Sequence, residues 1–156
     1  MPIAPGRNLK KVNREPFISS GQRDRKFYPA TDDLASLKTF IVEDNPLIRR
    51  NLVEAMTELL DVNILGFAEN EDDARSWLSG HQRDWQLLIV DLFLQQGSGL
   101  GVVQQCQNRS EQQRVVVLSN YATDEIRTRC MTSGADAVFD KSTELDQFLA
   151  YCAARY

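Results

Sequence analysis

Short apolar runs alternate with amphipathic stretches from residue 38 to the end of the chain, and the alternation repeats five times. The runs are rich in β-branched residues, and the middle ones are almost continuously apolar, which is typical of strands buried on both faces of a sheet. We therefore predict five strands, at residues 38–43, 62–68, 86–91, 114–119 and 136–140.

The stretches between these runs repeat their apolar residues at the spacing of an α-helix. The first helix is expected to begin at Asn45 and Pro46, which suit the N-cap and the first helical position. Its predicted buried residues are Ile48, Leu52, Met56 and Leu59. The second is expected to be capped by Asn70, with Asp73 three residues later, and to end near Gly80. Its predicted buried residues are Ala74, Trp77 and Leu78.

Three further helices are predicted at residues 99–108, at residues 123–133 with Gly134 just past the end, and near the C-terminus. The last helix has its apolar positions at Leu145, Phe148, Leu149 and Cys152. Alternating strands and helices predict an α/β fold with an open, doubly wound, parallel sheet covered on both faces. Five strands favour the flavodoxin-like (βα)5 order 2-1-3-4-5, in which ligands bind at the carboxyl ends of the first and third strands.

Charge divides the chain into two parts. Residues 1–30 hold seven basic and two acidic residues, whereas residues 31–156 hold 11 basic and 20 acidic residues. We expect residues 1–36 to form a basic, flexible extension and residues 37–156 to form the folded domain. An acidic domain disfavours nucleic acid as a partner, although the extension, with Phe27 and Tyr28 as its aromatic cluster, leaves that alternative open.

Several classes of protein are disfavoured by composition. No apolar run approaches the roughly 18 residues of a membrane span, and the N-terminus lacks the apolar core of a secretory signal. We therefore expect a cytoplasmic protein without a membrane partner. The three cysteines, Cys106, Cys130 and Cys152, are widely spaced, and His81 is the single histidine, so a Cys/His zinc site is not expected. Reduced, buried thiols are the better interpretation.

Acidic residues end two of the predicted central strands. The first runs into Glu43 and Asp44, and the third runs into Asp91. In the predicted order these strands are neighbours, about 4.8 Å apart, so three carboxylates should converge on one crevice. Such a cluster suits Mg²⁺, which prefers a few carboxylate oxygens and retained waters. A carboxylate beside this ion can act as a nucleophile toward a phosphoryl group.

The fourth and fifth strands end in groups that suit a phosphoryl ligand. Ser119 ends the fourth strand and offers a hydroxyl donor, and Lys141 follows the fifth strand and offers an ammonium group. Each feature is weak by itself, because strand-terminal acids often cap helices and single lysines are usually solvated. Their joint placement at one edge of the sheet predicts a phosphoryl-binding site.

Four segments are similar to the signature blocks of bacterial response-regulator receiver domains: FIVEDNPLIRR, LLIVDLFLQQGSGLGVV, VVVLSN and GADAVFDKS. The resemblance covers residues 37–156. It implies that Asp91 is the phosphoacceptor, and that Asp44 and Asp91 ligate Mg²⁺ together with the backbone carbonyl of Phe93, while Glu43 acts through water. It also implies that Ser119 binds the phosphoryl oxygen and that Lys141 pairs with Asp91 or its phosphate.

The chain departs from the resemblance at the switch position. Receivers usually have an aromatic residue three positions before the lysine, and here that position is Val138. Phe139 cannot substitute for it, because a one-residue offset reverses the face of a strand. Tyr121, two residues after Ser119, is a weaker candidate for a related role. Phe93 and Tyr121 stand where the family influences access of hydrolytic water, so we expect a longer-lived phosphoryl group.

The resemblance implies a stand-alone, single-domain response regulator. Its partners would be a histidine kinase or phosphotransfer protein and a downstream effector protein in a phosphorelay, and dimerisation is left open. It would not be an enzyme beyond Mg²⁺-dependent self-phosphorylation and slow self-dephosphorylation. The alternative is a receiver-like interaction module that acts without phosphorylation. A P-loop is absent, and Gly97, Gly99 and Gly101 lack the spacing of a dinucleotide loop, so a flexible loop is the simpler account of these glycines.

Overall fold

The computed structural model describes residues 36–155, in which strands and helices alternate throughout. Almost all of the expected N-terminal extension, residues 1–36, lies outside the described residues. The strands are β1 (Leu37–Val42), β2 (Val62–Ala68), β3 (Leu87–Asp91), β4 (Arg114–Ser119) and β5 (Ala137–Asp140). The helices are α3 (Pro46–Leu59), α4 (Glu71–Gly80), α5 (Gly99–Gln105), α6 (Asp124–Thr132) and α7 (Leu145–Arg155).

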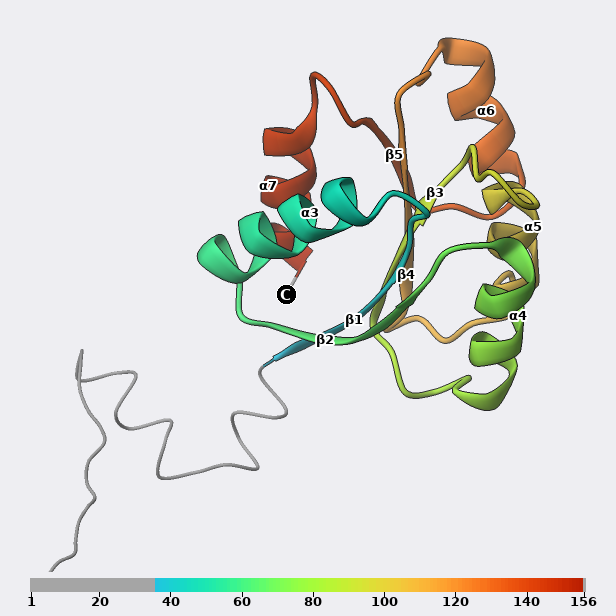
Figure 1. The fold of residues 1–156 in the computed structure, drawn as a ribbon, viewed down its shortest axis with the longest axis horizontal. Helices are drawn as coiled ribbons and strands as arrows, with labels where there is room; N and C mark the ends of the chain where they lie inside the picture. Colours follow the sequence, from blue (N-terminus) through green and yellow to red (C-terminus); the bar gives the residue numbers. More distant parts are fainter. Residues whose placement is uncertain (1–35, 156) are drawn as a thin grey trace, which may run out of the picture. The chain divides into compact units, whose positions relative to one another are not determined.

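The strands form one parallel sheet in the order β2-β1-β3-β4-β5, which confirms the predicted topology. Helices α3 and α7 cover one face of the sheet, and α4, α5 and α6 cover the other (Figure 1). The strand order reverses between β1 and β3, so the loops that follow these strands lead to helices on opposite faces. This arrangement leaves the carboxyl ends of β1 and β3 open to a ligand.

Two apolar layers form the core, one on each face of the sheet. Leu88 and Val90 of β3 belong to the layer under α4, α5 and α6, whereas Leu87 and Ile89 belong to the layer under α3 and α7. This division follows from the strand geometry, in which successive side chains point to opposite faces. Because both faces are buried, the central strands are apolar at nearly every position.

The predicted helix starts are confirmed. The Asn45 side chain accepts hydrogen bonds from the backbone N–H groups of Leu47 and Ile48, and the Asn70 side chain accepts one from the N–H of Asp73. Thr123 caps α6 in the same way. Beyond the other end of α6, Gly134 has a φ of +116°, a conformation that favours glycine.

Some boundaries and burial predictions were wrong. Leu59 is 66% exposed, because it lies in the last turn of α3 and the chain leaves the helix at Leu60, which packs against the core instead. Trp77 is half-buried, with its ring stacked between Phe40 and His81. The helix predicted at residues 99–108 ends at Gln105, and the first strand begins and ends one residue earlier than expected.

The cysteines are as predicted: all three are free and buried. Burial raises the pKa of Cys106 to about 11 and that of Cys152 to about 12, so both thiols stay protonated near neutral pH. No helix within residues 36–155 combines the length and the apolarity that a bilayer span requires.

Candidate functional site

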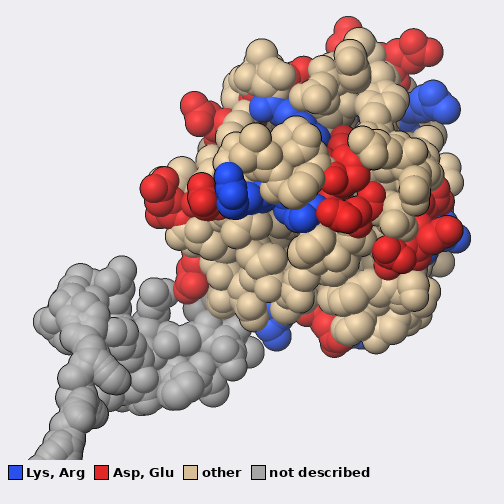
Figure 2. Space-filling view, viewed as in Figure 1, with Lys and Arg blue, Asp and Glu red and all other residues tan. Residues whose placement is uncertain are grey.

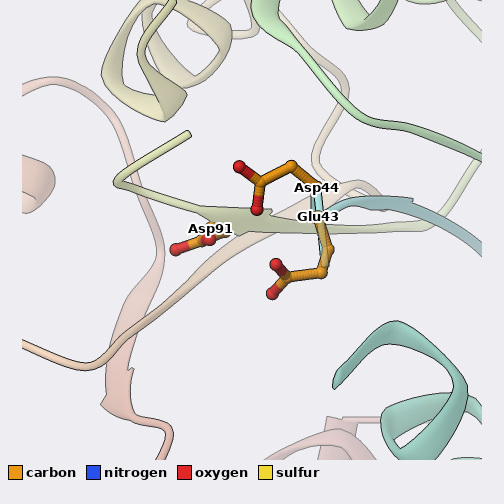
Figure 3. A group of neighbouring side chains, drawn as sticks. All are labelled: Glu43, Asp44 and Asp91. Carbon is orange, nitrogen blue, oxygen red and sulfur yellow. The ribbon is translucent and has the colours of Figure 1, made fainter. Parts of the chain in front are cut away.

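Three carboxylates gather where β1 and β3 end. β1 runs into Glu43 and Asp44, and Asp91 is the last residue of β3. Oxygens from the three side chains lie within 4.8 Å of one another, and Figure 3 shows Glu43 and Asp44 leaving opposite sides of the chain beside Asp91. Glu43 and Asp91 are buried and Asp44 is half-buried. On the face shown in Figure 2, acidic side chains gather at the place where these strands end.

Lys141 is the counter-charge of the two buried acids. Its Nζ lies 2.5 Å from Glu43 Oε1 and 3.3 Å from Asp91 Oδ2. Its backbone N–H donates to the carbonyl of Ser119 at 2.9 Å, so the loop after β5 is tied to the end of β4. The structure thus places Lys141 beside Asp91, as the sequence predicts. The contact with Glu43, however, was not predicted.

The environment of Asp91 disfavours its charged form. Burial is the largest cause and raises the pKa of Asp91 to about 6. Lys141 and the N–H of Phe93 oppose this rise, and the negative charge of Glu43 adds to it. One ammonium group therefore does not balance the carboxylates of this site.

The loop between β3 and α5 is held close to the acids by backbone hydrogen bonds. The N–H of Gln95 donates to Asp44 Oδ2 at 2.7 Å, and the N–H of Phe93 donates to Asp91 Oδ1 at 3.3 Å. From α4, Glu71 Oε1 accepts from the N–H of Ser98 at 2.8 Å. The backbone of Phe93 is thereby kept beside the site.

The glycines of this loop have a steric role, which corrects the interpretation of a flexible loop. A Cβ on Gly99 would lie 2.1 Å from the backbone oxygen of Asp91, and one on Gly101 would lie 2.1 Å from a carboxylate oxygen of Glu71. Gly97, with a φ of +83°, also has Glu71 against it. Gly99 packs against the backbone of Asp91 and Gly97 combines a positive φ with contact to the Cβ of Glu71, so both positions require glycine. At Gly101 a side chain would displace only the carboxylate end of Glu71.

Ser119 ends β4, the strand beside β3, and two aromatic residues lie in the loops that follow these strands. Ser119 is fully buried, and its Oγ accepts a hydrogen bond from the N–H of Tyr121 at 3.0 Å. The Tyr121 ring meets the Phe93 ring edge to face, with centroids 5.6 Å apart. Both rings are more than half exposed. The two residues that the resemblance links to water access are thus in contact with each other.

Val138 and Phe139 occupy opposite faces of β5, as the strand geometry requires. Val138 is buried in the layer under α6. Phe139 packs on the other face, against Phe148 and Tyr151 of α7. Phe139 therefore cannot take the position of an inward aromatic residue on the α6 side.

A sheet edge that combines a carboxylate cluster, a lysine and a buried hydroxyl matches a known family. The family model described as the response regulator receiver domain matches residues 39–153. This chain belongs to that family. Receiver domains are phosphoacceptors in two-component signalling, and the acidic group of this receiver is the one formed by Glu43, Asp44 and Asp91.

Two curated proteins similar to this receiver are longer than it. The transcriptional regulatory protein CitB of Klebsiella pneumoniae is 27% identical over 84 residues, which are 54% of this chain and 35% of that protein. The activator DevR/DosR of Mycobacterium tuberculosis is 24% identical over 99 residues, 64% of this chain and 45% of that protein. The chain thus spans less than half the length of these relatives. The receiver domain of NarL from Mycobacterium tuberculosis, 21% identical, superposes with a TM-score of 0.64 over 76% of this chain and 97% of that one.

Two residues that sequence reasoning missed connect the receiver's site to its outer helices. Arg127 of α6 and Glu144, just before α7, form an ion pair at 2.8 Å. Neither residue ends a strand or belongs to a motif of the resemblance, so the sequence carries no signal that separates them from solvated charges. Their partners, described below, are set by tertiary structure.

Proposed function

We propose that Asp91 accepts a phosphoryl group from a histidine kinase or phosphotransfer protein. An oxygen of the Asp91 carboxylate attacks the phosphorus atom, a new P–O bond forms, and the donor's bond to phosphorus breaks with its electron pair leaving on the donor. The observation that carries this proposal is the position of Asp91, a buried strand-terminal carboxylate between two further acids and a lysine. Small phosphoryl donors such as acetyl phosphate would serve in the same way.

The donor set fits Mg²⁺, a hard cation that prefers oxygen ligands. The carboxylates of Asp44 and Asp91 and the backbone carbonyl of Phe93 would hold the ion, with Glu43 acting through water. Three carboxylates against one lysine leave an excess of negative charge that a divalent cation would offset. When bound, the ion neutralises charge on the incoming phosphoryl oxygens.

Lys141 and Ser119 are proposed to hold the phosphoryl group once it is attached. Lys141 already lies 3.3 Å from Asp91, and an added phosphoryl group brings acceptor oxygens and about −1.5 to −2 charges within its reach. Ser119 offers a hydroxyl donor at the end of the neighbouring strand. Together the two residues would bring the loops after β4 and β5 toward Asp91.

The signal would be read by a partner protein that contacts the receiver surface. A ligand shifts a conformational equilibrium only by its differential affinity for the two states, so phosphorylation must change contacts of Ser119 and Lys141 with their loops. In this proposal the chain acts as the receiver of a response regulator in a phosphorelay. The second candidate is an interaction module that works without phosphorylation, which is favoured by the presence of Val138 in place of an aromatic switch.

The deciding experiment is the intact mass of the protein after incubation with acetyl phosphate and Mg²⁺. We expect the mass to rise by one phosphoryl group, and the gain to be absent in Asp91→Asn and in a sample treated with EDTA. Asp44→Ala should also prevent the gain, through loss of Mg²⁺ binding. If the folded protein gains no mass while it binds Mg²⁺, phosphorylation by small donors is refuted. The result would then favour an interaction module that works without phosphorylation.

A further inference from the structure

Arg127 joins three separate segments of the receiver. From α6, its Nε donates to the carbonyl of Ala122 at 2.8 Å and its Nη1 donates to the carbonyl of Val138 at 3.0 Å. Its Nη2 donates to Glu144 Oε1 at 2.8 Å. The same Glu144 oxygen accepts from the N–H of Asp140 at 2.8 Å. One guanidinium group thus binds the loop before α6, the edge strand β5 and the turn before α7.

These contacts lie beside both residues proposed to hold the phosphoryl group. Ala122 is three residues after Ser119, in the same loop. Asp140 and Glu144 bracket Lys141, and the backbone N–H of Lys141 donates to the carbonyl of Ser119. Displacement of either loop toward Asp91 therefore strains or breaks at least one bond of Arg127.

We propose that Arg127 and Glu144 form a latch that holds α6, β5 and the start of α7 together while Asp91 is a free carboxylate, and that the latch opens when Asp91 carries a phosphoryl group. The inference rests on the proposed function and adds the residues that link the site to a surface which a partner can read. In this role Arg127 is a positioning residue, because it touches none of the reacting atoms.

The packing of Val138 supports this assignment. Its side chain is 8% exposed and lies within the apolar layer under α6, so a large swing of this side chain has no room. Its backbone carbonyl, in contrast, is bound by Arg127. The movable link on the α6 side of β5 is therefore a set of hydrogen bonds that a shift of roughly 1 Å would break.

The alternative is that Arg127 is only a structural ion pair. A second arginine offers a control, because Arg109 also donates to backbone carbonyls and to one carboxylate, at the opposite end of the sheet. Arg109 donates to the carbonyls of Cys106, Gln113 and Gly134 and to Asp136 Oδ2. A structural role predicts similar behaviour of the two arginines, and a latch predicts a difference.

The test measures the affinity for beryllofluoride, a mimic of the phosphoryl group, in the presence of Mg²⁺. The full chain, Arg127→Met and Arg109→Met are titrated by fluorine NMR, and amide hydrogen exchange of α6 and α7 is followed in the same samples. Since coupling is reciprocal, removal of a latch that favours the free state must tighten beryllofluoride binding. We expect Arg127→Met to bind at least about fivefold more tightly and its α6 amides to exchange faster before ligand is added.

Arg109→Met should keep the affinity of the wild-type protein even where it unfolds more easily. Glu144→Gln, which keeps an oxygen acceptor for the N–H of Asp140 but removes the charge, should tighten binding by a smaller factor than Arg127→Met. Unchanged or weaker binding by Arg127→Met, or equal tightening by Arg109→Met, would overturn the latch. If the wild-type chain binds no beryllofluoride, or Asp91→Asn binds it equally well, the proposed function itself fails and the latch with it.

Discussion

The two ends of the sheet both hold charged groups in largely buried positions, but they balance them differently. At the amino end, Arg109 meets three carbonyls and one carboxylate, and Asp136 Oδ2 accepts from Arg109 at 2.6 Å and from the N–H of Val115 at 2.8 Å. At the carboxyl end, Glu43 and Asp91 share the single ammonium group of Lys141, and Asp44 lies next to them.

This difference separates a structural cluster from a functional one. A charge that is removed from water, even in part, is stable when it is paired and its hydrogen-bonding positions are filled, as at the partly buried Asp136. Asp91 has too little compensation, and burial raises its pKa to about 6. Perturbed pKa values of this kind gather at functional sites, because the missing compensation is supplied by a ligand. In the proposed function a cation and a phosphoryl group supply this compensation at the carboxyl end, whereas the amino end already has its own.

Removal of Lys141 at the carboxyl end should lower the stability of the protein more than any other change described here. Lys141→Met leaves Glu43 and Asp91 buried together without a counter-charge, so we expect the free energy of unfolding to fall by about 3–5 kcal/mol. Urea unfolding at pH 7.5 in EDTA measures this loss. The loss should shrink at pH 5, where Asp91 is largely protonated. Arg50→Met, on the exposed surface of α3, is the control, and a loss no larger than the control's would contradict the prediction.

The sequence predicted which residues meet at the carboxyl end of the sheet, because their positions at the ends of strands determine where they lie. Asp91 and Ser119 are the last residues of apolar strands, and Lys141 directly follows another, so parallel pairing alone brings them to one edge. The strand order was predictable for the same reason, since alternating strands and helices allow few topologies. These inferences need only the periodic pattern of apolar and polar residues, and no knowledge of side-chain packing.

The sequence did not predict contacts that depend on how far a side chain reaches in the folded protein. Arg127 lies in the polar helix α6, where its charge is indistinguishable in the sequence from that of Arg129. Only the folded structure brings its guanidinium group to Val138 and Glu144. The predicted burial of Leu59 was wrong for a related reason, because the exposure of Leu59 depends on where α3 ends relative to the sheet.

Neutralising Asp136 tests the amino end. Asp136→Asn keeps one oxygen acceptor but loses the charge that binds Arg109, so we expect the free energy of unfolding to fall by about 1.5–3 kcal/mol. Urea unfolding measures the loss, and phosphoryl uptake from acetyl phosphate should not change. A gain in stability would contradict the view that this cluster is fully compensated.

Neutralising Asp91 should change the free energy of unfolding in the opposite direction to neutralising Asp136. The pKa of Asp91 is about 6 in the folded protein, above its ordinary value of 3.8, so its ionisation destabilises the fold above pH 6 and this cost disappears as the pH falls toward 4. Asp91→Asn removes the cost, and we expect it to raise the free energy of unfolding by about 1–2 kcal/mol at pH 7.5, since part of the cost is screened by water.

Thermal unfolding of wild type and Asp91→Asn between pH 4 and pH 8 in EDTA measures that difference. The two curves should converge below pH 6, and Mg²⁺ should stabilise the wild-type protein more than the variant. A variant that is less stable than wild type at pH 7.5 would show that Lys141 compensates Asp91 fully, and the contrast between the two ends would then disappear.

The smallest expected effect concerns the two aromatic rings in the loops that follow β3 and β4. Phe93 and Tyr121 follow Asp91 and Ser119 by two residues each, and their edge-to-face contact spans the two loops. If this pair restricts water at an aspartyl phosphate, its loss removes an interaction of about 0.5–1.5 kcal/mol and speeds phosphoryl loss roughly 2- to 10-fold. Phe93→Ala and Tyr121→Ala should each have most of this effect, and the double variant little more, because either change breaks the same contact.

The rate of phosphoryl loss is followed by the decay of the phosphorylated mass, with Met131→Ala on α6 as the control for loss of an exposed apolar side chain. Strictly additive effects would mean that the rings act separately, and unchanged rates would mean that water reaches the phosphoryl group by another route.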